Sequence, residues 1–355
     1  MNNTLIDRIT GSLCLAGMGD ALGAQTEQWT IAEIARAHHG LVQQFGIPPA
    51  DTFAGANAGK RAEVTDDASQ MYYLARAIVK NGGSLDYNAW VACLLDWANT
   101  SPKANFMGPS TLGIVNALRA GEDVARVGVI GTSYRKMTTV GNTNGAAMRV
   151  APCGLVHPGD LIGACELTYI TCLPSHDTDV AISAACCIAA ACSEAMTGSS
   201  LAEVIQACLR GAAIGEHMGR ERARTVAGPQ MLARIEMALE IAARARDDMS
   251  FMVEMERKVG TSVLAAESVA AAIGVLAYAN ADPLRTISLA SSIGNDTDTI
   301  ATMAGAIAGA MHGVSRLPAD LLSEFLLVNG AEYRLQDLAH ALSLVATQHA
   351  AALQP

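Results

Sequence analysis

Small apolar residues that recur at helical spacing are the feature that most constrains the fold of this chain. Residues 3–23 place Ile9, Leu13 and Ala16 on one side of a helix. Over the whole chain 51% of residues are hydrophobic but only 4% are aromatic, and runs of β-branched residues are few. Because small side chains let helices approach closely, we predict an all-α fold of tightly packed helices rather than a β-sandwich.

The same periodicity predicts where most helices lie. One helix should begin at Asp66 and Asp67 and end near Gly82 and Gly83. Further helices are predicted over residues 87–97, 110–119, 158–171, 177–196, 201–215, 229–245, 263–280, 284–292, 296–312, 318–328 and 335–350. Residues 40–63 and 128–145 are expected to be irregular, and long loops such as 40–63 often act as lids. No strand run and no low-complexity linker interrupts the pattern, so we predict a single domain over residues 1–355.

Composition excludes several classes of protein. The 355 residues carry a formal charge of −10 and no basic cluster of the nucleic-acid-binding type. Nine scattered cysteines without a CxxC pair are typical of reduced, buried thiols in a cytoplasmic protein. The apolar stretches are too short to span a membrane, and Asp7 and Asp20 flank the N-terminal one, which argues against a signal peptide. We therefore expect a cytoplasmic protein with neither nucleic-acid nor membrane partners.

Two acidic clusters stand at predicted helix starts, one at Thr65, Asp66 and Asp67 and the other over residues 296–299. Asp and Thr are good N-caps, so capping alone is one interpretation. Each cluster nevertheless has more acids than capping needs, and carboxylates gathered beside a core are costly unless a cation neutralises them. Four carboxylates and two hydroxyls without a nearby His or Cys indicate a hard, all-oxygen site for Mg²⁺, or alternatively Mn²⁺, which two ions could share.

A third cluster, His176, Asp177 and Asp179, competes for this role. It has Val180 where the second cluster has the hydroxyl of Thr299. Substrate contact and helix capping by this cluster remain open, and both are favoured over metal ligation.

Several segments together resemble the ADP-ribosylglycohydrolase family, which includes dinitrogenase-reductase-activating glycohydrolases and ADP-ribosyl-acceptor hydrolases. The resemblance spans residues 10–313. Its segments are Gly19-Asp20-Ala21-Leu22-Gly23 with Glu27, Thr65-Asp66-Asp67 with Met71, residues 144–152, Glu267-Ser268-Val269-Ala270-Ala271, and residues 294–299 with Gly305 and Gly309.

The resemblance implies an orthogonal all-α fold with a binuclear Mg²⁺ or Mn²⁺ centre. It makes six residues the metal ligands: Thr65, Asp66, Asp67, Asp296, Asp298 and Thr299. It also implies that an acidic residue assists attack of water at the anomeric carbon, and Glu27 and Asp67 are the candidates for that catalytic role. Asp20 stays open between function and a structural ion pair.

Candidate substrate-binding residues lie in glycine-rich stretches and beside them: Gly108, Ser110, Thr111, Asn144, Gly145, Met148, His176 and Ser262. Backbone N–H groups in such stretches can cradle a phosphate, although ordinary turns are an equal alternative. Few aromatic residues are available to stack an adenine. The candidates are Trp29, Phe45, Phe53, Phe106 and Tyr134.

The sequence thus predicts a metal-dependent hydrolase of a ribosyl glycosidic bond. The substrate expected first is ADP-ribose on a modified side chain or small adduct. Two departures from the family pattern leave this open: Ala68 follows Asp67 where many relatives have a hydroxyl, and residues 52–62 contain no acid. A simpler N-ribosyl compound such as a nucleoside is the alternative substrate, and a non-catalytic binding or structural protein is the alternative of another class. The sequence does not indicate the oligomeric state.

Overall fold

The structure is a computed structural model that describes residues 3–352, and within them it is built from helices. In this part of the chain no β-strand forms, and only three isolated bridges are present, between Val129 and Lys136, Thr143 and Leu264, and Thr178 and Arg224. The predicted all-α class is therefore confirmed.

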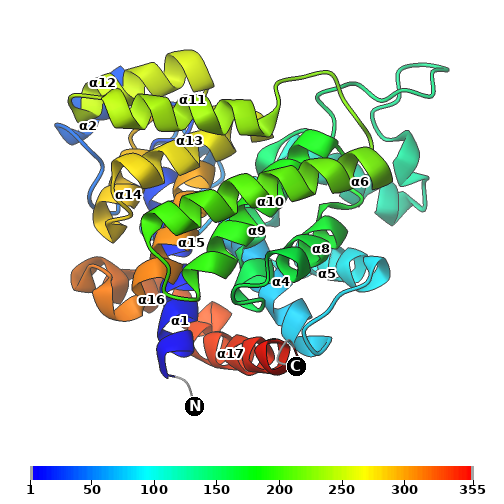
Figure 1. Ribbon diagram of the computed structural model, residues 1–355. Helices are drawn as coiled ribbons and strands as arrows, with labels where there is room; N and C mark the ends of the chain where they lie inside the picture. The colour runs from blue at the N-terminus through cyan, green and yellow to red at the C-terminus, as the bar shows by residue number, and fades with distance from the viewer. Residues whose placement is uncertain (1–2, 353–355) are drawn as a thin grey trace.

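Helices α1 (Asn3–Gly23) and α15 (Thr297–His312) form the centre of the fold and lie side by side (Figure 1). Glycines allow this contact, because a Cβ at Gly23 would lie 2.4 Å from the Cα of Asp298. No side chain fits in that space. The end of α1 is thus held against the beginning of α15, which places the acidic residues of the two segments together.

A second close pair lies beside the first. Helix α9 (Asp179–Ala195) is almost entirely buried, and α10 (Leu201–Arg222) runs along it (Figure 1). Here a Cβ at Gly219 would lie 2.5 Å from the Cα of Asp179. Both pairs depend on small residues, as the composition predicted.

The other helices surround these pairs, with α11 and α12 at one end of the molecule and α16 and α17 at the other (Figure 1). The remaining α-helices are α2 (Ile31–His38), α3 (Phe53–Ala56), α4 (Asp66–Lys80), α5 (Tyr87–Thr100), α6 (Pro109–Ala120), α7 (Ala151–Leu155), α8 (Leu161–Cys172), α11 (Met231–Arg244), α12 (Asp248–Glu254), α13 (Ala265–Tyr278), α14 (Pro283–Ala290), α16 (Ala319–Tyr333) and α17 (Leu335–Ala352). Short 3₁₀ helices η1, η2, η3 and η5 span Ala104–Phe106, Val124–Arg126, Asn144–Arg149 and Val314–Arg316, and the π-helical turn η4 spans Met255–Val259.

The predicted helices are found, with some differences at their ends. Helix α10 continues to Arg222, beyond the predicted end at residue 215, because Gly215 packs against α9 instead of ending the helix. The short helices α2, α7 and α12 were not predicted, although Thr30 and Glu33 form a capping box that signals the start of α2. The predicted loop 40–63 is irregular apart from the four residues of α3.

All nine cysteines are free thiols, and all except Cys93 are buried. This agrees with the prediction of buried, reduced cysteines. Within residues 3–352 no helix combines the length and hydropathy needed to cross a membrane.

Candidate metal centre

Three helix ends bring the predicted carboxylates together: the C-terminus of α1 and the N-termini of α4 and α15. Oxygens of Asp20, Asp67 and Asp298 lie within 4.8 Å of one another, and so do oxygens of Glu27, Asp296 and Asp298. All five residues are buried. The two groups share Asp298, so they form one continuous acidic centre that could hold more than one cation.

Asp20 organises the start of α4. Its carboxylate accepts hydrogen bonds from the N–H of Thr65 at 3.0 Å, the Thr65 hydroxyl at 2.8 Å and the N–H of Ala68 at 3.0 Å. The side chain is fully buried. Asp20 therefore fixes the helix end that carries Asp66 and Asp67, and it also lies among the acids of the centre.

Two carboxylate oxygens of the centre are buried without a hydrogen-bond partner in the described part of the chain, Oε2 of Glu27 and Oδ1 of Asp67. A buried charge without a partner is costly unless a cation compensates it. Two further oxygens are held in place: Asn144 donates to Oδ2 of Asp296 at 2.5 Å, and Oδ2 of Asp67 lies 3.0 Å from the Thr65 hydroxyl, whose single proton it shares with Asp20. Fixed oxygen donors with open lone pairs fit a hard divalent cation.

The electrostatics lead to the same conclusion. Burial, together with the charges of Asp296 and Asp20, raises the pKa of Glu27 to about 8, against a hydrogen bond from Gln28 that lowers it. Burial also raises the pKa of Asp20 to about 6 and brings those of Asp66, Asp67 and Asp298 well above their usual range. Without cations, the centre therefore retains protons near neutral pH.

A cavity of about 220 Å³ opens onto this centre. All six predicted metal ligands line it, as do both candidate catalytic residues. The predicted substrate-binding residues that line it are Gly108, Ser110, Thr111, Asn144, Gly145, Met148 and His176. The tertiary structure thus brings together segments that are far apart in the sequence.

Ser262 is the predicted residue that does not line the cavity. Its hydroxyl donates to Glu267 at 2.6 Å, while its neighbour Val263 lines the cavity and is 42% exposed. Gln28 and Val263 are lining residues that the sequence interpretation missed, and neither carries a motif that would have revealed it.

Two of the candidate aromatic residues reach the cavity. Phe53 from α3 and Phe106 from η1 both line it, and their rings meet edge to face with centroids 6.3 Å apart. Trp29, Phe45 and Tyr134 are not among the lining residues. Phe53 is 40% exposed, so an apolar edge lies beside the polar centre.

The third acidic cluster is neutralised by basic side chains. Asp177 pairs with Lys136 and with Arg224, each at 3.0 Å. His176 is fully buried, and burial followed by the charge of Arg149 holds its pKa well below the usual range. A neutral His176 thus contributes a polar surface to the cavity wall.

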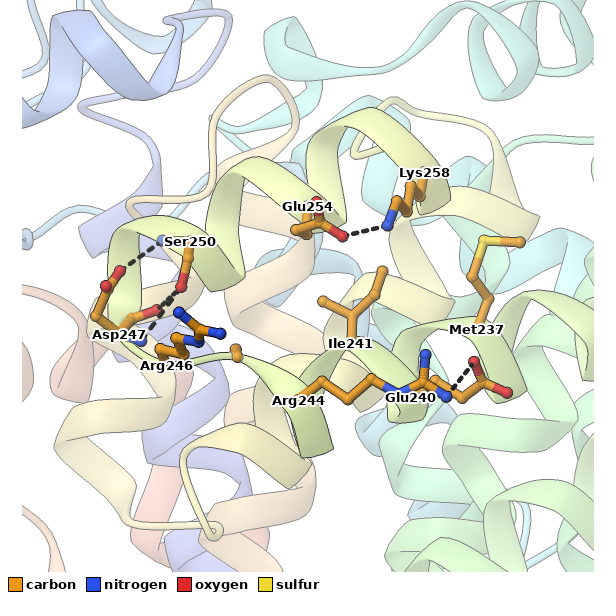
Figure 2. A pocket seen from close by; sticks show the side chains of 10 residues that line it. Met237, Glu240, Ile241, Arg244, Arg246, Asp247, Ser250, Glu254 and Lys258 are labelled. Atoms are coloured by element: carbon orange, nitrogen blue, oxygen red, sulfur yellow. Dashed lines mark hydrogen bonds and ion pairs between the residues drawn. The ribbon is translucent and has the colours of Figure 1, made fainter.

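A second hollow of about 330 Å³ lies between α11 and α12 (Figure 2). Four of its charged residues pair locally: Lys258 with Glu254, and Arg244 with Glu240 at 3.5 Å. Asp247 caps α12. This hollow therefore lacks the converging, unpaired carboxylates of the acidic centre.

The fold and the site together define an all-α protein with a buried, all-oxygen carboxylate centre at a cavity, the kind of centre that holds hard divalent cations. The family model of ADP-ribosylglycohydrolase matches residues 1–351, and the chain belongs to this family. The family implies a hydrolase that acts on ADP-ribosyl glycosidic bonds.

Individual relatives agree with this assignment. The uncharacterized protein YegU of Escherichia coli (strain K12) is 33% identical over 92% of this chain and 94% of its own length. The ADP-ribosylarginine hydrolase Tri1 of Pseudomonas putida (strain GB-1) is 25% identical over 88% of this chain and 72% of its own. A solved structure described as an ADP-ribosylglycohydrolase-related protein complex shares the fold, with a TM-score of 0.65 at 19% identity over 97% of this chain and 99% of that one.

Proposed function

We propose that the protein is a metal-dependent hydrolase that removes ADP-ribose from a modified side chain or small adduct. The observation that carries this proposal is the convergence of buried carboxylates with partnerless oxygens on Glu27 and Asp67 at the base of a cavity. The family assignment supplies the ADP-ribosyl bond as the target.

The residues that would hold two Mg²⁺ or Mn²⁺ ions are Thr65, Asp66, Asp67, Asp296, Asp298 and Thr299. When bound, such ions supply positive charge that orients ribose hydroxyls and water. The donor set contains only oxygen, which favours Mg²⁺ or Mn²⁺ over Zn²⁺.

Glu27 is suited to act as the general base. Its Oε2 faces no protein donor, and the raised pKa shows how weakly the site solvates its charge. As water attacks the anomeric carbon, Glu27 would take one of its protons, and the bond from that carbon to the leaving nitrogen or oxygen would break with its electron pair on the leaving atom. The proton held by Glu27 would then pass to that leaving atom. Asp67 is the second candidate, because its Oδ1 is also without a partner.

The N-terminus of α6 favours a substrate with phosphate groups. Gly108 occupies the N-cap position without a side-chain cap, so the first N–H groups of this 12-residue helix have no capping acceptor. Gly108, Ser110 and Thr111 line the cavity. Such a helix end stabilises an anion, as a diphosphate would provide.

The size of the cavity favours a second candidate substrate. Its volume of about 220 Å³ lies below the range of about 300–1,000 Å³ that is usual for larger ligands. A ribonucleoside would place less of its bulk outside the cavity than ADP-ribose would. We therefore retain hydrolysis of a simpler N-riboside as the second function.

A substrate screen tests the proposal. The protein, with Mg²⁺ or Mn²⁺, should hydrolyse ADP-ribosyl-arginine or ADP-ribosyl-serine, and ADP-ribose should inhibit far better than ribose. Turnover of a ribonucleoside that ADP-ribose does not inhibit would favour the second function. Metal binding without turnover of any of these compounds would instead indicate a non-catalytic binding protein.

A further inference from the structure

We propose that Arg149 is a positioning residue with two effects. Through Gln70 it orients the carboxylate of Asp66. Through a series of hydrogen bonds it also makes the Ser110 hydroxyl a donor that faces the cavity. This inference rests on the proposed function, because it assigns Asp66 to the metal centre and Ser110 to the substrate.

Arg149 is an unusual buried cation. It lies in η3, is 0% exposed, and forms no ion pair with any carboxylate of residues 3–352. Its guanidinium instead donates to the Gln70 amide oxygen at 2.8 Å and to the Thr171 carbonyl at 3.1 Å, and it lies 4.8 Å from the ring centroid of Trp90. Burying a charge with only neutral partners is expensive, so a role beyond packing is indicated.

The first branch of the network leads to the metal centre. Arginine only donates hydrogen bonds, so Gln70 must turn its amide oxygen toward Arg149. The amide nitrogen of Gln70 then faces Asp66 and donates to Oδ2 at 3.2 Å. Arg149 thereby fixes the orientation of the Asp66 carboxylate, one helical turn earlier on α4.

The second branch begins at Ser175, whose hydroxyl oxygen accepts from Arg149 at 3.3 Å. The other partner of this hydroxyl is Nδ1 of His176 at 2.8 Å, and no further acceptor is present for it among the described residues. The Ser175 proton therefore goes to Nδ1. A neutral His176 that accepts at Nδ1 carries its own proton on Nε2.

This proton position sets the direction of each following hydrogen bond, up to the wall of the cavity. Nε2 of His176 donates to the Thr143 hydroxyl at 3.0 Å, and Thr143 donates to the Ser110 hydroxyl at 3.1 Å. Ser110 already accepts, so its proton is left to donate to a ligand. A hydroxyl that donates from the first turn of α6 fits a hydrogen-bond acceptor such as a phosphoryl oxygen.

Variants separate the two branches. Gln70→Leu breaks only the branch to Asp66, and we expect it to weaken Mn²⁺ binding to EDTA-treated protein by about 10- to 100-fold. Ser175→Ala breaks only the other branch. It should leave Mn²⁺ affinity unchanged and weaken inhibition by ADP-ribose by about 10-fold, the value of one hydrogen bond.

Arg149→Met should show both effects. Arg8→Met is the matched control, because Arg8 is also an arginine that donates to backbone carbonyls, those of Ala195, Ala310 and Met311, away from the cavity. It should lower stability without changing either affinity. The Gln70 and Ser175 variants keep the inference testable if Arg149→Met does not fold.

The tautomer of His176 gives a direct readout that needs no substrate. Imidazole ¹⁵N shifts, assigned with His176→Gln, should show the Nε2–H form in the wild type and a shift toward Nδ1–H in Ser175→Ala. The inference would be overturned if His176 carried its proton on Nδ1 in the wild type. It would also be overturned if Gln70→Leu bound Mn²⁺ as tightly as the wild type does. Either result would leave the proposed function intact. If the wild type binds no Mn²⁺, the proposed function fails and this inference fails with it.

Discussion

Glu27→Gln should stabilise the metal-free protein while it strongly lowers turnover. Glutamine keeps the size and shape of the side chain but cannot ionise. In the folded protein, burial and the neighbouring carboxylates raise the pKa of Glu27 from 4.5 to about 8. Between these two values the folded state binds this proton more tightly than the unfolded state does, so wild-type stability falls as the pH rises from 4.5 to about 8.

The size of the effect follows from the pKa shift. Each pKa unit corresponds to about 1.4 kcal/mol. At pH 7 the unfolded chain has lost the proton and the folded chain has kept it, so Glu27 lowers the free energy of unfolding by about 3 kcal/mol. Glu27→Gln should remove this penalty at pH 7 and have almost no effect below pH 4.5, where both states are protonated.

Urea unfolding in EDTA at pH 4.5, 6, 7 and 8 measures this difference, and turnover is measured separately with Mn²⁺. Loss of a general base should lower kcat by about 10²- to 10⁴-fold. Glu240→Gln is the control, because Glu240 is exposed and its one ion pair among the described residues is with Arg244 in its own helix. Wild-type pH dependence of unfolding in Glu27→Gln would refute the reasoning, since the carboxylate would then not be the desolvated group.

The remaining predictions concern the metals and the packing of the helices. Asp298→Ala should abolish Mn²⁺ binding and turnover yet raise the Tm of the EDTA-treated protein. The Tm should rise because burial and the charge of Glu27 hold the pKa of Asp298 well above its usual range. Activity within a few-fold of wild type would instead mean that Asp298 only caps its helix. Mg²⁺ or Mn²⁺ at 100 times its Kd should stabilise the wild type by about 2.7 kcal/mol, and an unchanged Tm at millimolar metal would contradict the metal centre. Gly23→Ala should destabilise the protein by about 1–3 kcal/mol or more, because its Cβ would meet the backbone of Asp298 at 2.4 Å. Gly330→Ala has room within α16 and should instead stabilise by about 0.5–1 kcal/mol, so equal Tm values for the two alanine variants would contradict the tight packing of α1 on α15.

Local patterns were sufficient for most of the fold. Helical spacing of apolar residues located α1, α4 and α15, because each helix buries a stripe of side chains that recurs along the sequence. The same patterns failed for α2, α7 and α12, which have only 8, 5 and 7 residues and are too short to show a helical repeat. They also misplaced the end of α10, where Gly215 is required by a neighbouring helix and does not end its own.

The residues proposed for the site could be predicted from the sequence because their chemistry is local. Clustered acids at Asp66 and Asp298, each ahead of an apolar helix, indicate oxygen ligands whatever the rest of the chain does. The role of Asp20 could not be assigned in this way, because its partners, Thr65 and Ala68, lie 45 or more residues away.

What only the tertiary structure decided is which distant groups meet. Gly23 against Asp298 places the two acidic clusters together, and hydrogen bonds connect the buried Arg149 to Asp66 through Gln70 and to Ser110 through Ser175, His176 and Thr143. These contacts depend on backbone approach and on the direction of hydrogen bonds between separate segments. The sequence by itself determined which helices and which ligand chemistry are present, since these depend on neighbouring residues. The packing of helices that are distant in the sequence determined the shape of the cavity and the orientation of the groups that line it.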